Sequence, residues 1–185
     1  MNFQAGFVHF IPVTQRDADT VARNLLEYLG PAYNQPHIMV KSDNAREVIA
    51  AAKQLHFTHE ATLENRFPHN SVLERDIRTS EEITRACHLQ AGFDVNEGMW
   101  PLSIEYASTI FNAVHKPNGQ DKTRHFLATN SEFSGRQVLL GQLVHYRIDP
   151  TKRGKFDAST SPGLFAGWLF DAGPKSHKNV YYVVD

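Results

Sequence analysis

Apolar and polar positions follow two different periods in the first part of the chain. Short apolar runs at residues 6–13, 37–43 and 57–63 are each typical of a strand. Between the runs, apolar positions recur every three to four residues from Asp17 to Gly30 and over residues 44–55, which predicts two helices. Strands that alternate with helices in this way are expected to form a parallel sheet with crossover helices.

Two longer helical patterns follow, and then the pattern changes. Apolar residues share one helix face from residue 70 or 71 to about residue 90, and again over residues 100–114. Residues 116–135 hold few apolar positions and are interpreted as a linker. Short runs of β-forming residues, interrupted by Gly and Pro, then occupy residues 138–148, 163–170 and 180–184. This spacing indicates a small antiparallel barrel.

Charge is distributed unevenly between these two parts. The 185 residues have a formal net charge of −1. Residues 1–115 have 9 Lys and Arg against 14 Asp and Glu, or −5, whereas residues 116–185 have 10 against 6, or +4. Contacts with phosphate are therefore expected in the C-terminal part, around Lys152, Arg153 and Lys155, although solvated lysines on turns would give the same pattern.

Cysteine content and hydropathy indicate the cellular compartment in which the protein is expected. Cys87 is the single cysteine, so the sequence excludes an internal disulfide and a zinc site of the CxxC type. No apolar run is long enough to cross a bilayer, and the first residues lack the pattern of a secretion signal. We therefore expect a protein of the nucleus or cytoplasm that is neither secreted nor membrane-bound.

Two acidic residues are candidates for catalysis. Asp43 ends the run at residues 37–43, and open α/β sheets bind ligands at the carboxyl ends of their parallel strands. Glu74 comes early in the helix that begins near residue 70, so its carboxylate could lie beside that strand end. Two carboxylates there would hold Mg²⁺ or Mn²⁺, and a pair of such ions stabilises the attacking and leaving oxygens in phosphodiester displacement. The same residues also suit structural roles, Asp43 as a helix cap and Glu74 as a partner of the helix dipole.

Several longer sequence motifs contain these two residues or follow them in the chain. They are Lys41-Ser-Asp43-Asn-Ala-Arg-Glu47, Asn65-Arg-Phe-Pro68-His-Asn70-Ser-Val-Leu-Glu74-Arg75, Thr84-Arg-Ala and Trp100-Pro, and they resemble the integrase core of copia-type LTR retrotransposons. The strings Gly141-Gln-Leu-Val-His-Tyr146, Pro162-Gly163-Leu-Phe-Ala-Gly167-Trp and Tyr181-Tyr-Val-Val-Asp185 resemble the SH3-like module that follows this core in the same polyproteins. The two sets occur in the expected order and cover nearly the whole chain.

The resemblance implies an α/β chain in three parts. Residues 1–115 would form a partial integrase catalytic core of the ribonuclease H-like fold, residues 116–135 a linker, and residues 136–185 a small all-β SH3-like barrel. The family binds two divalent metal ions, Mg²⁺ or Mn²⁺, with three acidic residues. Asp43 matches the second catalytic aspartate and Glu74 the glutamate, with 30 residues between them, a somewhat shorter interval than in retroviral integrases.

The same resemblance suggests which residues contact DNA. Asn70 and Arg75 belong to the motif around Glu74, and the basic residues near the end of the chain would add contacts with phosphate. Two departures from the motifs are small, since Ala45 and Ser71 each stand where the family often has glycine.

The larger departure is at the start of the chain. The family's first catalytic aspartate lies on its first strand, upstream of the part that residues 1–13 resemble, so the first two strands and one metal ligand are expected to be missing. We therefore expect an integrase fragment, related to DNA integration by strand transfer but inactive by itself. The alternative is a non-catalytic module that binds nucleic acid or takes part in assembly, with DNA, a second copy or other polyprotein products as partners.

Overall fold

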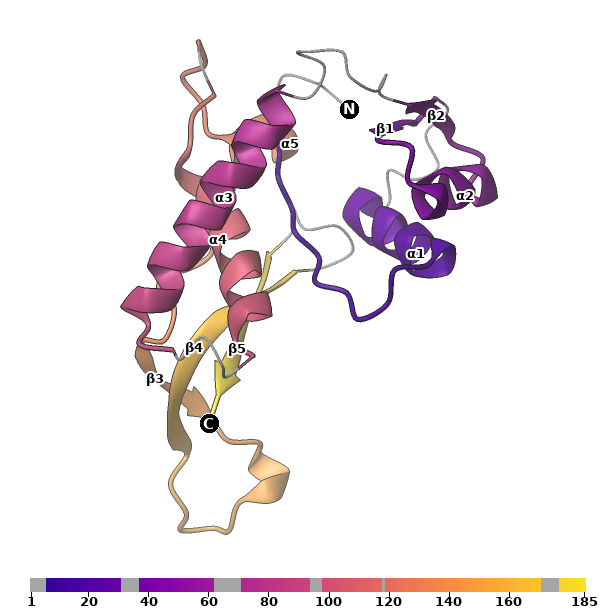
Figure 1. The fold of residues 1–185 in the computed structure, drawn as a ribbon. Helices are drawn as coiled ribbons and strands as arrows, with labels where there is room; N and C mark the ends of the chain where they lie inside the picture. The colour runs from indigo at the N-terminus through magenta and orange to yellow at the C-terminus, as the bar shows by residue number, and fades with distance from the viewer. Residues whose placement is uncertain (1–5, 31–36, 62–70, 94–97, 118, 171–176) are drawn as a thin grey trace.

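The structure is a computed structural model that describes residues 6–30, 37–61, 71–93, 98–117, 119–170 and 177–185. Its helices and strands form two groups, which are visible on either side of the N-terminal segment in Figure 1. The N-terminal group contains α1 (Ala18–Leu29), β1 (Met39–Ser42), α2 (Arg46–Gln54) and β2 (Thr58–Ala61). The C-terminal group contains α3 (Ser71–Gln90), α4 (Trp100–Val114), α5 (Arg124–Thr129), β3 (Leu143–Arg147), β4 (Thr160–Phe170) and β5 (His177–Val184).

The N-terminal group follows the pattern of the sequence. β1 and β2 pair in parallel with Met39 opposite Thr58, and α2 is the crossover between them. Helix α1 begins at the cap residue Asp17, whose carboxylate accepts a hydrogen bond of 2.9 Å from the backbone N–H of Thr20. Helices α1 and α2 pack together through alanines, which are the buried residues of both helices. The prediction of parallel strands with a crossover helix is confirmed for this pair.

The apolar run at residues 6–13 does not form a strand, so this prediction was wrong. The backbone of Val8 instead pairs with the side chain of Asn112 in α4, and the phenol of Tyr28 donates to the carbonyl of Phe7. The apolar side chains of residues 7–12 are half-buried, and Phe7 lies between Tyr28 of α1 and a cavity lined by Asn112 of α4 rather than within a sheet. Apolar content predicted that the segment would be buried, but it could not distinguish burial within a sheet from burial against helices.

The C-terminal group contains an antiparallel sheet with the order β3-β4-β5, in which Leu143 faces Leu164. This sheet confirms the expected α/β chain with antiparallel strands at its end. β3 is shorter than the run at residues 138–148, because Leu139 to Gln142 form a turn with Gly141 at a φ of 73°. α3 packs on α4, and α4 contacts β4.

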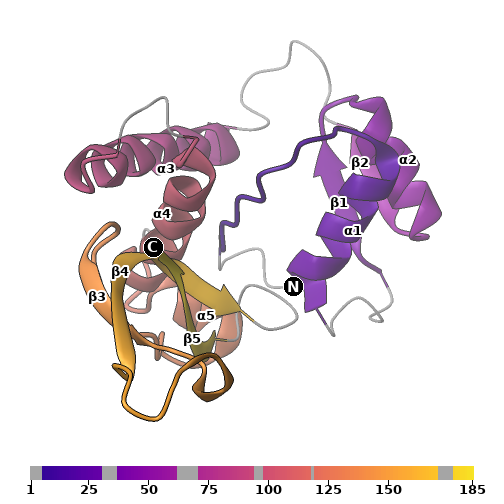
Figure 2. The ribbon, with the colours of Figure 1, turned by 90° about the horizontal axis from the view of Figure 1, so that it is seen from below.

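Helix α5 was not expected, because it lies inside the segment interpreted as a linker. It has six residues, too few to show a helical period, and the side chain of Thr123 caps it by accepting from the N–H of Phe126 at 3.2 Å. The helix packs against α4 (Figure 2). None of the described helices is long and apolar enough to cross a membrane.

Candidate functional site

Asp43 lies where the sequence predicted, directly after the parallel strand β1 and before α2. Its side chain is exposed and accepts one hydrogen bond of 3.3 Å from the N–H of Ala45. The neighbouring Ser42 hydroxyl donates to the carbonyl of Asp43 at 2.7 Å, so Nε2 of His59, 2.9 Å away, donates to the serine oxygen. The Asp43 carboxylate therefore keeps free oxygens that face solvent.

Glu74 is an exposed residue in the first turn of α3, followed by the exposed Arg75. Asn70 lies outside the described residues. β1 belongs to the N-terminal group and α3 to the C-terminal group, and both views show the N-terminal segment between them (Figures 1 and 2). Within the residues that the structure describes, no three acidic, histidine or cysteine side chains gather in a way that could hold a metal ion.

The basic residues near the end of the chain lie in the connection between β3 and β4. Lys152 ends a 3-10 turn, and Lys155 lies over the ring of Phe156 with 5.8 Å from Nζ to the ring centroid. Asp149 and Asp157 accept hydrogen bonds from backbone N–H groups of this connection, and no ion pair in the described part of the chain involves Lys152, Arg153 or Lys155. Phe156 is 94% exposed. The connection thus presents two lysines and an aromatic ring to solvent, with the half-buried Arg153 beside them.

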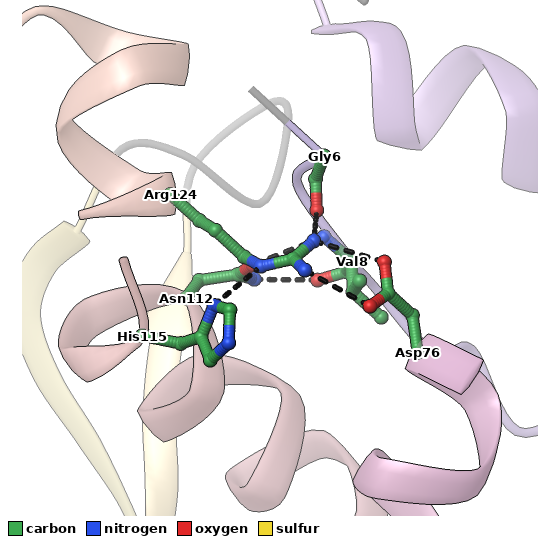
Figure 3. A network of polar contacts seen from close by, with 6 residues as sticks. All are labelled: Gly6, Val8, Asp76, Asn112, His115 and Arg124. Atoms are coloured by element: carbon green, nitrogen blue, oxygen red, sulfur yellow. Dashed lines mark hydrogen bonds and ion pairs between the residues drawn. The ribbon is translucent and has the colours of Figure 1, made fainter. Parts of the chain in front are cut away.

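A buried polar network, absent from the sequence-based expectations, joins α3, α4, α5 and the N-terminal segment (Figure 3). The guanidinium of Arg124 donates two hydrogen bonds, of 3.0 and 2.9 Å, to the carboxylate of Asp76. It also donates to Nδ1 of His115 at 3.1 Å and to the carbonyl of Gly6. Only 7% of the Arg124 side chain and 13% of the Asp76 side chain are exposed. Each charge in the network has a partner, and the network links four segments of the chain.

Three histidines at or near the N-terminal segment have lowered pKa values. Burial lowers the pKa of His9 from 6.5 to about 4. Burial also lowers the pKa of His125, while the charge of Glu132 opposes this shift. For His115, burial and the cation of Arg124 lower the pKa, and the carboxylate of Asp76 opposes them. Each of these shifts favours the neutral imidazole.

Glu105 on α4 lines a small cavity beside this segment. Burial and the nearby charge of Glu27 on α1 raise the pKa of Glu105. The cavity measures about 30 Å³ and is also lined by His9, Trp168 and Tyr182. This volume suits one or two water molecules rather than an organic substrate.

Comparisons with known proteins give two kinds of result. No family model matches the chain, and no curated protein matches it. Among solved structures, it is similar to the catalytic core domain of BIV integrase, with 17% sequence identity and a TM-score of 0.49 over 66% of this chain and 78% of that chain. It is also similar to a chain of the simian T-cell lymphotropic virus intasome in complex with PP2A regulatory subunit B56 gamma. That match has 15% identity and a TM-score of 0.49, and it covers 90% of this chain but 62% of the other.

Proposed function

We propose that this chain is a fragment of a copia-type retroelement integrase that acts in the nucleus or cytoplasm. In this proposal a partial ribonuclease H-like core over residues 1–115 precedes a linker over 116–135 and an SH3-like module over 136–185. The observation that carries the proposal is the position of Asp43. It stands, within a motif of the integrase core, at the carboxyl end of a parallel strand whose crossover helix follows at once.

The proposed ligands for Mg²⁺ or Mn²⁺ are Asp43 and Glu74. Both carboxylates are exposed, and carboxylate oxygens are ligands that these cations prefer. The described residues, however, provide no group of three ligands, so they do not fit a pair of metal ions. Strand transfer depends on two metal ions that stabilise the attacking and the leaving oxygens of the phosphate. We therefore propose that this chain by itself does not cleave or join DNA.

DNA binding, unlike catalysis, requires no metal site. Lys152, Arg153 and Lys155 are free of ion pairs with described residues and can displace counterions from a phosphate backbone. Arg75, exposed beside Glu74, is a further candidate for contact with DNA, and Asn70 of the same motif is proposed with it. The expected affinity is weak, sensitive to salt and independent of sequence.

The test is a strand-transfer assay with end-labelled duplex DNA and Mg²⁺ or Mn²⁺. We expect no product from the chain. Variants Asp43→Asn and Glu74→Gln are the controls, and they are matched because each removes one charge with little change in shape. A metal-dependent product that disappears in either variant would overturn the proposed inactivity. Loss of affinity for DNA in the same two variants would contradict the assignment of binding to the C-terminal part.

A second candidate is a non-catalytic module that binds nucleic acid or assembles with other polyprotein products. The observation that favours it is the exposed ring of Phe156 among three cations, because single-stranded nucleic acid binds to such combinations of aromatic and basic side chains. Tighter binding to single-stranded than to duplex DNA, unchanged in Asp43→Ala and weakened in Phe156→Ala, would favour this candidate.

A further inference from the structure

Residues 6–9, which we call the strap, lie along a groove of the C-terminal group, and Figure 3 shows Gly6 and Val8 beside Asn112 and Arg124. The groove contacts the backbone of the strap. Oδ1 of Asn112 accepts the N–H of Val8 at 3.0 Å, and Nδ2 of Asn112 donates to the carbonyl of Val8. Arg124 donates to the carbonyl of Gly6. These bonds depend on an extended backbone rather than on a particular side chain, as when an extended peptide docks along a sheet edge.

The groups that hold the strap are fixed by their own neighbours. Arg124 is oriented by its two hydrogen bonds to Asp76 and lies over the ring of Phe111, 4.6 Å from its centroid. Asn112 is 3% exposed and Arg124 is 6% exposed. A receptor whose side chains are already ordered loses little entropy when a peptide docks.

Two side chains of the strap also face the groove. Phe7 and His9 line a small cavity together with Thr109, Asn112, His125 and Phe170. The ring of Phe7 lies 6.3 Å from the ring of His125, centroid to centroid. The groove therefore combines backbone recognition with places for two rings that this sequence provides.

The strap also contacts the N-terminal group. Tyr28 of α1 donates to the carbonyl of Phe7 at 3.1 Å, and its ring stacks on His9 at 6.3 Å. Residues 10–15 form no hydrogen bond in the described structure. Movement of the strap out of the groove breaks its hydrogen bonds to Asn112 and Arg124, while the bond between Tyr28 and Phe7 moves with it.

We propose that the groove is an interaction surface for the strap of a second copy, so that two copies exchange residues 6–61 and form a reciprocal dimer. A second copy presents the same extended segment with the same two rings, so every contact described above forms again between the chains. Exchange of identical elements costs little free energy and closes a symmetric pair, since each copy both gives and receives a strap. Higher protein concentration favours the exchanged form by mass action.

Cysteine trapping in the full chain tests the exchange. One chain carries His9→Cys and the other Thr109→Cys, both with Cys87→Ser, because His9 and Thr109 line the same cavities. The two chains are mixed, concentrated and oxidised gently. We expect a disulfide-linked heterodimer whose yield rises with concentration. A mixture without heterodimer, while a single chain with both cysteines closes its internal disulfide, would refute the exchange.

A control mixture of the Thr109→Cys chain with a Leu89→Cys chain measures how much disulfide forms by random collision. Leu89 suits this control because it is 68% exposed, at the end of α3. A yield of heterodimer as high as that with His9→Cys would also refute the proposal.

A second variant tests the backbone recognition. Val8→Pro removes the N–H that Asn112 accepts, whereas Val13→Pro changes a residue that is 47% exposed and forms no hydrogen bond in the described structure. Because the closed monomer and the exchanged dimer contain the same hydrogen bond, light scattering of the concentrated chain should show a dimer fraction for Val8→Pro within about twofold of the parent, while the free energy of unfolding falls because a buried acceptor loses its donor. Val13→Pro should dimerise like the parent. A dimer fraction that falls steeply in Val8→Pro but not in Val13→Pro, or no dimer in the parent at any concentration, would contradict exchange through this groove.

Discussion

The rings of Tyr106 and Trp168 stack with 5.2 Å between their centroids and an angle of 15° between their planes. Tyr106 belongs to α4, and Trp168 belongs to β4, so the last long helix and the C-terminal sheet share one hydrophobic core with Leu140 and Phe165. The phenol of Tyr106 donates to the carbonyl of Val138, and the indole N–H of Trp168 donates to the carbonyl of Arg136, both at 3.0 Å.

This shared core predicts that helix and sheet unfold together. Trp168→Ala should lower the free energy of unfolding by about 3–5 kcal/mol, because it leaves a large cavity. We expect one cooperative transition in urea, with the same midpoint when it is measured by near-ultraviolet circular dichroism and by the fluorescence of Trp100. Phe156→Ala is the matched aromatic control and should change stability by less than about 0.5 kcal/mol, since its ring is 94% exposed. Two separate transitions in the parent chain would contradict a shared core.

The buried ion pair between Arg124 and Asp76 predicts a large effect for one substitution. Asp76→Ala should cost about 3–5 kcal/mol of stability, because it leaves the guanidinium buried without its counter-charge. Arg124→Lys should be nearly as harmful, since one ammonium cannot reproduce the paired hydrogen bonds of a guanidinium to the carboxylate.

The exposed pair of Lys41 and Glu60 is the control for this experiment, with 42% and 53% of the two side chains exposed. Glu60→Gln should change stability by less than about 1 kcal/mol. Equal effects of the two acidic substitutions in thermal melts would show that the Arg124 network does not hold the segments together.

Histidines at the strap predict a loss of stability in acid. The pKa of His9 is lower in the folded chain, at about 4, than in the unfolded chain, at 6.5, so the unfolded chain binds more protons between these values. The contribution of His9 is complete above pH 6.5 and is lost as the pH falls through about 4. One such group corresponds to about 3 kcal/mol between pH 7 and pH 4. The lowered pKa values of His125 and His115 act in the same direction.

Urea denaturation at pH 7, 6, 5 and 4 measures this dependence. His9→Gln should flatten the pH profile, because it removes the titrating group from the strap. His145→Gln is a control on β3, away from the strap, and should leave the slope unchanged. A parent chain equally stable at pH 7 and pH 5 would be inconsistent with the burial of these histidines.

The connection between β3 and β4 predicts a change in the salt dependence of DNA binding. Replacement of Lys152, Arg153 and Lys155 by Ala should lower the slope of log K against log salt by about 0.9 for each DNA phosphate that the variant no longer neutralises. Fluorescence anisotropy with a labelled duplex measures this slope. Lys41→Ala, Lys53→Ala and Lys116→Ala together remove the same charge elsewhere and should lower the slope less. Equal slopes for the two triple variants would show that binding follows net charge alone.

Local patterns in the sequence determined a substantial part of this protein. Periodicity located α1, α2, α3 and α4, the parallel pair β1 and β2, and the antiparallel strands at the end. It also placed Asp43 at a strand end, because that position depends on one strand and the helix that follows it. These features depend on interactions between near neighbours in the chain.

Only the tertiary structure decided which segments lie together. Val8 and Asn112 are 104 residues apart in sequence, and Arg124 and Asp76 are 48 apart, so no local period connects them. An apolar run shows that a segment will be buried, but it does not identify the segment that packs against it. Burial of apolar surface is favourable whichever apolar surface covers it. The strand predicted at residues 6–13 was wrong for this reason, since a buried asparagine offered its backbone the same pair of hydrogen bonds that a neighbouring strand would have offered.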